Sequence, residues 1–180
     1  MRPDVLLVWR LRQGDRDACV ELIHRHHQKV YGYLRRLGAD SPLAEDLTQE
    51  TYAKAWAHLE TLHEAPSLRS WLLAIARNEY FQWRRVKRAD EQTTAEPPDC
   101  PDERPSAEEN LGRAERDQRL WQAVAQLEAD SQETVALHYF QELSLKEVGA
   151  VLGLPTGTVK SRLNRALESL RGVLRKGDGS

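Results

Sequence analysis

Four polar side chains in the last third of the chain have the types and the spacing of a DNA-reading surface. In the stretch PTGTVKSRLNRALESLR, apolar residues recur at helical spacing and leave a polar set on the opposite side of the predicted helix: Lys160, Ser161, Asn164 and Arg165. Lysine and arginine can bind phosphates or guanine edges, and asparagine can make a paired contact with adenine. Such a helix can read bases in the major groove, whereas the alternative is an ordinary solvated helix face.

A helix-turn-helix is predicted to position these four side chains. Ser144 and Glu147 have the spacing of a capping box, which starts the first of the two helices. The Gly-Leu-Pro sequence at 153–155 ends that helix and turns the chain, after which Thr156 or Thr158 can cap the second helix. The capping box, the turn and the polar face together favour DNA recognition over a solvated face.

A second candidate DNA surface lies at the basic and aromatic end of a helix that starts near Leu68. The segment 69–88 contains six basic residues and one acid, a net charge of +5. Aromatic side chains here can stack on unpaired bases or belong to the core, and we assign Trp71 to the core because it shares a helix face with Ile75. The alternative is a basic helix end that serves only solubility. The candidate DNA contacts are Arg77, Asn78, Arg84, Arg85, Lys87 and Arg88.

A third candidate surface lies on a helix that is predicted to begin at Ser41-Pro42. Serine can cap the free amides of the first turn, and proline at the first helical position loses no hydrogen bond. The apolar residues of this helix form one stripe, and three polar residues lie outside it: Asp46, Gln49 and Glu50. These side chains can bind a protein partner or can simply be solvated.

The elements around these surfaces predict an all-α fold with two small helical domains. Two further helices between residues 4 and 37, separated by a turn at Gly14-Asp15, complete a four-helix domain over 1–88. The segment 89–110 contains eight acids, one arginine and four prolines, so its net charge is −7 and it has little apolar surface to bury. We therefore expect an acidic flexible linker there and a helix-turn-helix domain over 111–180.

Composition limits the classes of protein that this chain can belong to. The chain has 180 residues with a formal net charge of −2, and it lacks the roughly twenty consecutive apolar residues of a membrane span. The first fifteen residues do not form a secretory signal, and Cys19 and Cys100 do not suggest a disulfide framework. We expect a cytoplasmic location in a reducing compartment. The charge blocks predict two cationic surfaces separated by an anionic tether.

Three motifs together resemble the extracytoplasmic-function sigma factors, in the sigma-70 family of RNA polymerase sigma factors. AEDLTQETYAKAW and WLLAIARNEYFQWRRVKR are similar to two conserved helices of the first domain of that family, and PTGTVKSRLNRALESLR is similar to its second DNA-binding helix. The three motifs have the order and separation of the family, and the resemblance extends from about Asp4 to Lys176. It implies a promoter-recognition subunit and no enzyme activity, with no cofactor, bound metal or small-molecule substrate.

The resemblance also implies roles for the three surfaces. The first partner is core RNA polymerase, through the coiled-coil clamp of its largest subunit and its flap, and the second is promoter DNA. Asp46, Gln49 and Glu50 align with the face that binds the clamp. The candidate set around Asn78 would recognise and help melt the minus-ten element, and the set around Arg165 would read the minus-thirty-five element. The linker would follow the nucleic-acid channel of the polymerase, and an anti-sigma factor, often membrane-bound, is a further implied partner.

Two positions depart from the family pattern. Gln82 stands where many relatives have an aspartate before paired arginines, and Asn164 stands where an aromatic residue is often found. The promoter sequence therefore does not follow from the resemblance.

Two alternative classes of function remain at this stage. The first is a stand-alone helix-turn-helix regulator, although such a protein has no need of the AEDLTQE helix. The second is a metal site, catalytic or regulatory, built from Cys19, His24, His26 and His27, in which His24 and His27 share a helix face. No second ligand cluster or paired carboxylate accompanies these residues, so an exposed histidine-rich helix is the favoured interpretation.

Overall fold

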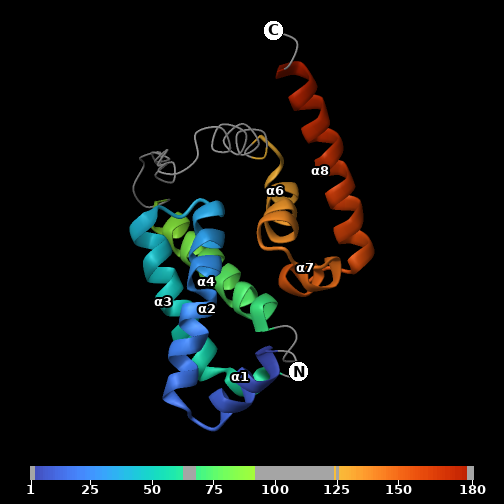
Figure 1. Ribbon diagram of the computed structural model, residues 1–180. Coiled ribbons are helices and arrows are strands. Elements are labelled where there is room, and N and C mark those ends of the chain that lie inside the picture. Colours follow the sequence, from blue (N-terminus) through green and yellow to red (C-terminus); the bar gives the residue numbers. More distant parts are fainter. Residues whose placement is uncertain (1–2, 63–67, 92–123, 125, 178–180) are drawn as a thin grey trace. The chain divides into compact units, whose positions relative to one another are not determined.

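The computed structural model describes residues 3–62, 68–91, 124 and 126–177, and every regular element in these ranges is a helix. The helices form two compact units (Figure 1). The first contains α1 (Pro3–Arg12), α2 (Arg16–Arg36), α3 (Ser41–Ala57), the short 3-10 helix η1 (Leu59–Thr61) and α4 (Leu68–Glu91). The second contains α6 (Ala129–Val135), the π-helical turn η3 (Ala136–Phe140), the first part of α7 (Leu145–Leu152) and α8 (Thr156–Gly177). The all-α prediction with two helical domains is confirmed.

Part of the predicted organisation falls outside the described residues. Almost all of the expected acidic linker lies there, as does a polar turn that the sequence predicts around 63–66, within the first domain. At the start of that linker, α4 continues to Glu91, three residues beyond the predicted end of the first domain.

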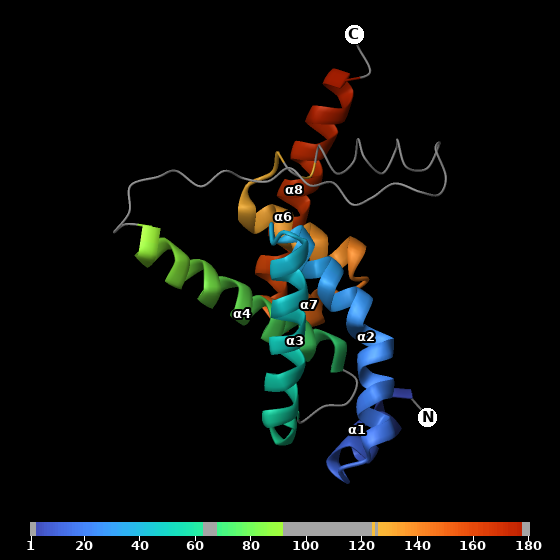
Figure 2. The ribbon, with the colours of Figure 1, turned by 90° about the vertical axis from the view of Figure 1, so that its left-hand side faces the viewer.

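The first unit is held together by α4, which crosses α2 and α3 obliquely (Figure 2). Its apolar side chains repeat every three or four residues, so one side of the helix is buried and the other is left for ligands. Tyr33 on α2 and Leu72 on α4 are fully buried in this core. The other main core side chains are Leu7, Leu11, Leu22, Val30, Leu34, Leu47, Leu68, Leu73, Ala76 and Tyr80.

The starts of α2 and α3 are capped by aspartates. The Asp15 carboxylate accepts hydrogen bonds from the amides of Asp17 and Ala18, directly after the predicted turn, where Gly14 has a φ of 75°. At α3, the cap is Asp40, which accepts from the Leu43 amide at 2.9 Å. The prediction that Ser41 caps this helix is wrong, because Ser41 is already its first helical residue.

His26 is a buried titratable group in the first unit, with an Nε2 atom that has no hydrogen-bond partner among the described residues. Burial and the nearby Arg25 and Arg69 lower its pKa more than Asp4 raises it. The pKa of His26 in the folded protein is therefore below its value of about 6.5 in the unfolded chain. As the pH falls below about 6.5, protons bind the unfolded chain more readily than the folded protein, so the fold loses stability.

We therefore expect the temperature at which the protein unfolds to decrease when the pH is lowered from 7 to 5, in part because of His26. In His26→Leu the decrease should be smaller, as followed by circular dichroism. The matched control is His24→Leu, which removes an exposed histidine of the same helix and should leave the decrease unchanged. An equal decrease in both variants would show that His26 does not contribute.

The second unit places α8 along α6 (Figure 1). The sequence predicts an apolar stripe on α8, of which Val159, Leu163, Ala166 and Leu170 are buried and Leu167 is half-buried. The last turn before the helix-turn-helix is a π-helix, η3, which the apolar pattern did not predict. A salt bridge of 2.9 Å from Arg162 to Asp130 also joins α8 to α6, although both partners are partly exposed.

The helix-turn-helix has the predicted capping box. The Glu147 Oε2 atom accepts from the Ser144 amide at 2.9 Å and from the Ser144 hydroxyl at 2.7 Å, while Ser144 Oγ accepts from the Glu147 amide at 3.3 Å. Gly153 then adopts a φ of 67°, and the Leu154 amide donates to the Gly149 carbonyl at 2.9 Å, which closes a Schellman-type end to α7.

The start of α8 differs from the prediction. The Val159 amide donates to the Pro155 carbonyl at 3.1 Å, and the helix begins at Thr156. Pro155 therefore occupies the capping position, and neither Thr156 nor Thr158 does so.

Gly149 is the position where the tight turn leaves least room. A Cβ atom there would lie 2.6 Å from the Leu154 carbonyl oxygen, which is backbone and cannot move aside cheaply. We expect Gly149→Ala to destabilise the second unit by about 1–3 kcal/mol, measured by urea unfolding. Gly172→Ala is the control. A Cβ atom added there would have no other atom within 4 Å, and alanine should stabilise α8 slightly. Equal stability of the two variants would contradict the close approach.

Candidate nucleic-acid interface

The reading face of α8 consists of Lys160, Ser161, Asn164 and Arg165. All four side chains are exposed, while the buried stripe on the other side of α8 fixes the rotation of the helix. The Ser161 hydroxyl donates to the Thr158 carbonyl at 2.9 Å, so its oxygen remains available as an acceptor. The face thus combines two cations, an amide and a hydroxyl on one rigid helix, which suits contacts to base edges and phosphates.

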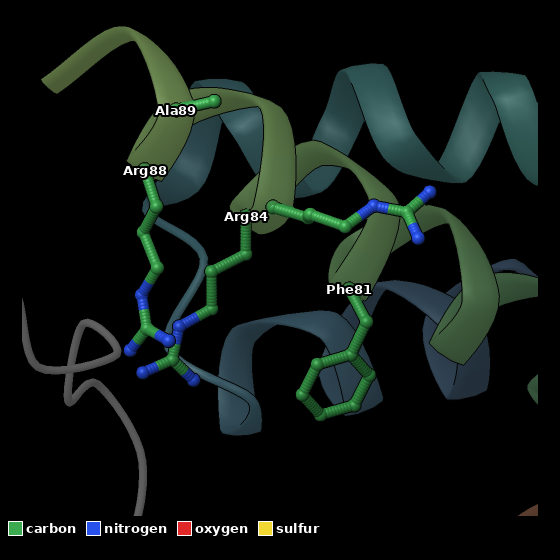
Figure 3. A pocket seen from close by; sticks show the side chains of 5 residues that line it. Phe81, Arg84, Arg88 and Ala89 are labelled. Atoms are coloured by element: carbon green, nitrogen blue, oxygen red, sulfur yellow. The ribbon is translucent and has the colours of Figure 1, made fainter. Parts of the chain in front are cut away.

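The arginine face of α4 consists of Arg77, Phe81, Arg84 and Arg88. The Arg77 guanidinium lies over the Phe81 ring, 4.8 Å from its centroid. Figure 3 shows Arg84 and Arg88 projecting from the helix to the same side, with Phe81 one turn away. These residues, with Arg85 and Ala89, line a shallow hollow of about 460 Å³. Neighbouring guanidinium groups repel each other and attract phosphates, so this face suits a nucleic-acid backbone.

A second surface of α4 faces a groove, here called the α3–α4 groove, with a volume of about 360 Å³. Across it, Lys54 Nζ on α3 donates to Glu79 Oε2 on α4 at 2.6 Å. Glu79 is buried, with 8% of its surface exposed, whereas Lys54 is half-buried. An unpaired base could enter such a groove between polar and aromatic side chains. The lining residues are Lys54, His58, Trp71, Ile75, Asn78, Glu79 and Gln82.

The six candidate contacts on α4 do not form one surface. Asn78 lies in the groove, whereas Arg77, Arg84 and Arg88 lie on the arginine face. At 100° per residue, Lys87 is on the opposite side of the helix from Asn78, and its ammonium lies 5.2 Å from the centre of the Trp83 ring. Sequence reasoning placed all of them at one basic helix end because it counted charges without helical rotation.

Trp71 is not a core residue, so that prediction is wrong. It shares a face with Ile75, as expected, but both are only half-buried and both line the groove. The buried side of α4 is instead occupied by residues such as Leu72 and Ala76. Lys54 and Glu79 were missed as groove residues, although Glu79 is the single acid in the basic segment 69–88.

The acidic face of α3 consists of Asp46, Gln49 and Glu50, which are all exposed on one side of the helix. Behind them, Thr48 and Thr51 are buried, and their hydroxyls donate to the Ala44 and Leu47 carbonyls at 2.6 and 2.7 Å. These bonds satisfy the two buried hydroxyls, so α3 can present its polar face from a packed helix. The arrangement suits a partner with complementary basic groups.

The four candidate metal ligands do not gather at one point, and the interpretation of their helix as an exposed histidine-rich helix is only partly right, because one histidine is buried. His26 is buried, His27 stacks on Tyr31 and lies 3.6 Å from Glu45, and Cys19 Sγ contacts the Asp15 carbonyl. Within the described ranges no three potential ligands converge as a metal ion would require.

No helix of the described chain is long and apolar enough to cross a membrane.

Comparison with family models matches both units. The model of sigma-70 region 2 matches residues 22–89, which includes the acidic face of α3 and all of the α4 surfaces. The model of sigma-70 region 4 matches residues 123–172, which includes the helix-turn-helix and its reading face.

Individual relatives span almost the whole chain. The chain is 32% identical to the ECF RNA polymerase sigma factor RpoE of Cereibacter sphaeroides, over 94% of each chain. It is 33% identical to the ECF sigma factor SigL of Mycobacterium tuberculosis, over 86% of this chain and 88% of that one. A solved structure of the sigma factor RpoE with the anti-sigma factor NepR from Bartonella quintana matches with a TM-score of 0.71 and 27% identity, over 85% of this chain and 94% of that one. The chain therefore belongs to the sigma-70 family, as one of its extracytoplasmic-function sigma factors.

Proposed function

We propose that this sigma factor uses surfaces on three helices to bring core RNA polymerase to a promoter. The acidic face of α3 binds the clamp coiled coil of the largest subunit, the surfaces of α4 bind the minus-ten element, and the reading face of α8 reads the minus-thirty-five element. The observation that carries the proposal is that the proposed contact residues of α3 and α8 are exposed and those of α4 are exposed or half-buried, while the opposite side of each helix is buried in its own unit.

The two surfaces of α4 divide the work at the minus-ten element. The α3–α4 groove accepts an unpaired base beside Asn78, while Arg84 and Arg88 hold the phosphates of the same region. Arg85 lies between these surfaces by helical rotation and adds a further cation. The protein supplies positioning and strand separation, and we propose that the polymerase alone forms the RNA bonds.

The arginine face can be tested by salt dependence. We expect Arg84→Ala/Arg88→Ala to weaken promoter binding by the holoenzyme and to make the slope of log K against log salt shallower. The slope should change by about 0.9 for each duplex phosphate that the variant no longer neutralises. The measurement is fluorescence anisotropy of a labelled promoter fragment over a series of salt concentrations.

Arg16→Ala is the control for this double substitution, because it removes an exposed arginine at the start of α2, outside the proposed surfaces. Its slope should equal that of the unmodified protein. A double variant that binds more weakly with an unchanged slope would assign Arg84 and Arg88 to folding rather than to phosphate binding.

We also propose an anti-sigma partner and a cytoplasmic site of action, where the polymerase is found. The similar RpoE structure contains an anti-sigma factor, which supports a regulator of the same kind for this chain. The acidic segment 89–110, which lies outside the described residues except for 89–91, would occupy the nucleic-acid channel of the polymerase, since its net charge of −7 suits a surface that holds phosphates.

A further inference from the structure

The Lys54–Glu79 ion pair is unusual because it places a buried carboxylate in a surface that must approach DNA. Glu79 is the single acid among six basic residues in the segment 69–88, and a carboxylate there weakens the attraction to phosphates. Its Oε2 atom is 2.6 Å from Lys54 Nζ, and both side chains line the α3–α4 groove. The Glu79 carboxylate repels the phosphates of the DNA backbone, yet it is held in the wall of the groove. It is therefore better suited to contacting a base than to holding a phosphate.

The Lys54–Glu79 pair places a hydrogen-bond acceptor beside a hydrogen-bond donor. The Glu79 carboxylate only accepts, and the Lys54 ammonium only donates, with N–H groups beyond the one bound to Glu79. The groove therefore offers an acceptor next to a donor. Trp71 provides an aromatic wall on which a base can stack, and Asn78 provides an adaptable amide.

The four bases differ in how well their pairing edges match this order. Cytosine has one amine followed by two acceptors, and guanine has one acceptor followed by two N–H donors, so each separates its donors from its acceptors along the edge. Either base can give three hydrogen bonds to an adjacent carboxylate and ammonium. On thymine the order is acceptor, donor and acceptor, so one of its carbonyl oxygens would face the carboxylate and be repelled. Adenine has only one donor and one acceptor on this edge, so it can make fewer hydrogen bonds.

We infer that Lys54 and Glu79 are specificity-determining residues, and that they make the α3–α4 groove select an unpaired cytosine or guanine over thymine or adenine. The inference deepens the proposed minus-ten function and rests on it. Glu79 acts both directly, as an acceptor, and by fixing the Lys54 ammonium at the groove wall.

The test uses the full-length protein bound to bacterial core polymerase and a bubble DNA whose unpaired strand is randomised. Bound molecules are sequenced and compared with those selected by core polymerase alone. We expect one position at which cytosine or guanine is enriched about tenfold, within the range that paired base contacts give. In Glu79→Gln the enrichment at that position should fall to about threefold or less, because an amide can donate as well as accept.

Two further variants separate base reading from folding. Lys54→Arg keeps the charge and the donors, so it should retain the preference, whereas Lys54→Met/Glu79→Leu removes the pair without leaving a buried charge and should lose it. Preferences at the other positions should persist in every variant. Glu60→Gln, an exposed acid of η1 outside the groove, is the matched control and should behave as the unmodified protein does.

The outcomes distinguish this inference from the function on which it rests. If one position is selected but Glu79→Gln and the double variant leave its base preference unchanged, or if the preferred base is adenine or thymine, the role of the pair is overturned. If no position is enriched over core polymerase alone, minus-ten reading by α4 is itself contradicted.

Discussion

The double substitution Asp46→Ala/Gln49→Ala is expected to weaken binding to core polymerase about 100-fold, equivalent to about 2.7 kcal/mol. Removal of one charged and one polar side chain from a protein interface reduces the binding free energy by an amount of this order, since the groups of the partner are left unpaired. Both side chains are exposed, so their removal should not disturb the core of the first unit. The measurement is titration of core polymerase against the labelled protein, followed by fluorescence anisotropy.

The control for the acidic face is Glu60→Ala, which removes an exposed acid from η1 in the same unit. It should bind core polymerase as tightly as the unmodified protein, and both variants should unfold at the same temperature as that protein. Full affinity in Asp46→Ala/Gln49→Ala would move the polymerase contact to another surface.

Arg165→Ala is expected to reduce transcription from promoters with an intact minus-thirty-five element by about 5- to 150-fold, while binding to core polymerase is unchanged. A paired contact to a base edge contributes about 1–3 kcal/mol of discrimination, and Arg165 is an exposed cation on the reading face of α8. The effect should be largest at the base pair that this arginine contacts, so the sequence preference there should relax. Transcription from a promoter library with randomised minus-thirty-five elements measures both effects.

The matched control for the reading face is Arg171→Ala, because Arg171 is an exposed arginine on the same helix that lies further along it than the four residues of the reading face. It should retain the sequence preference. An equal loss of polymerase binding and of promoter choice in Arg165→Ala would contradict a role specific to DNA reading.

The parts of the fold that were predicted from the sequence depend on local interactions. The capping box of Ser144 and Glu147 spans three residues, and the buried stripe of α8 follows from helical periodicity alone. The exposed positions of Asp46 and Arg165 follow in the same way, because the apolar stripe of a helix fixes which residues face away from it.

The incorrect predictions concern features that depend on backbone conformation and on the packing of helices, which the order of residues along the chain does not show. Both Asp40 and Ser41 can cap a helix, and only the backbone conformation places Asp40 at the capping position. Trp71 shares a face with Ile75, but which face of α4 meets the core depends on how α2 and α3 pack against it. The ion pair of Lys54 and Glu79 joins residues 25 positions apart on different helices, so only the packing of α3 against α4 brings them together.

Run-off transcription is the most direct test that this chain is a sigma factor acting through these surfaces. Bacterial core polymerase would be supplied with a genomic fragment library, with and without the protein. We predict new and specific start sites that disappear with Asp46→Ala/Gln49→Ala and whose upstream elements change with Arg165→Ala. Sequence-specific DNA binding without any initiation would contradict the account and would indicate a stand-alone helix-turn-helix regulator.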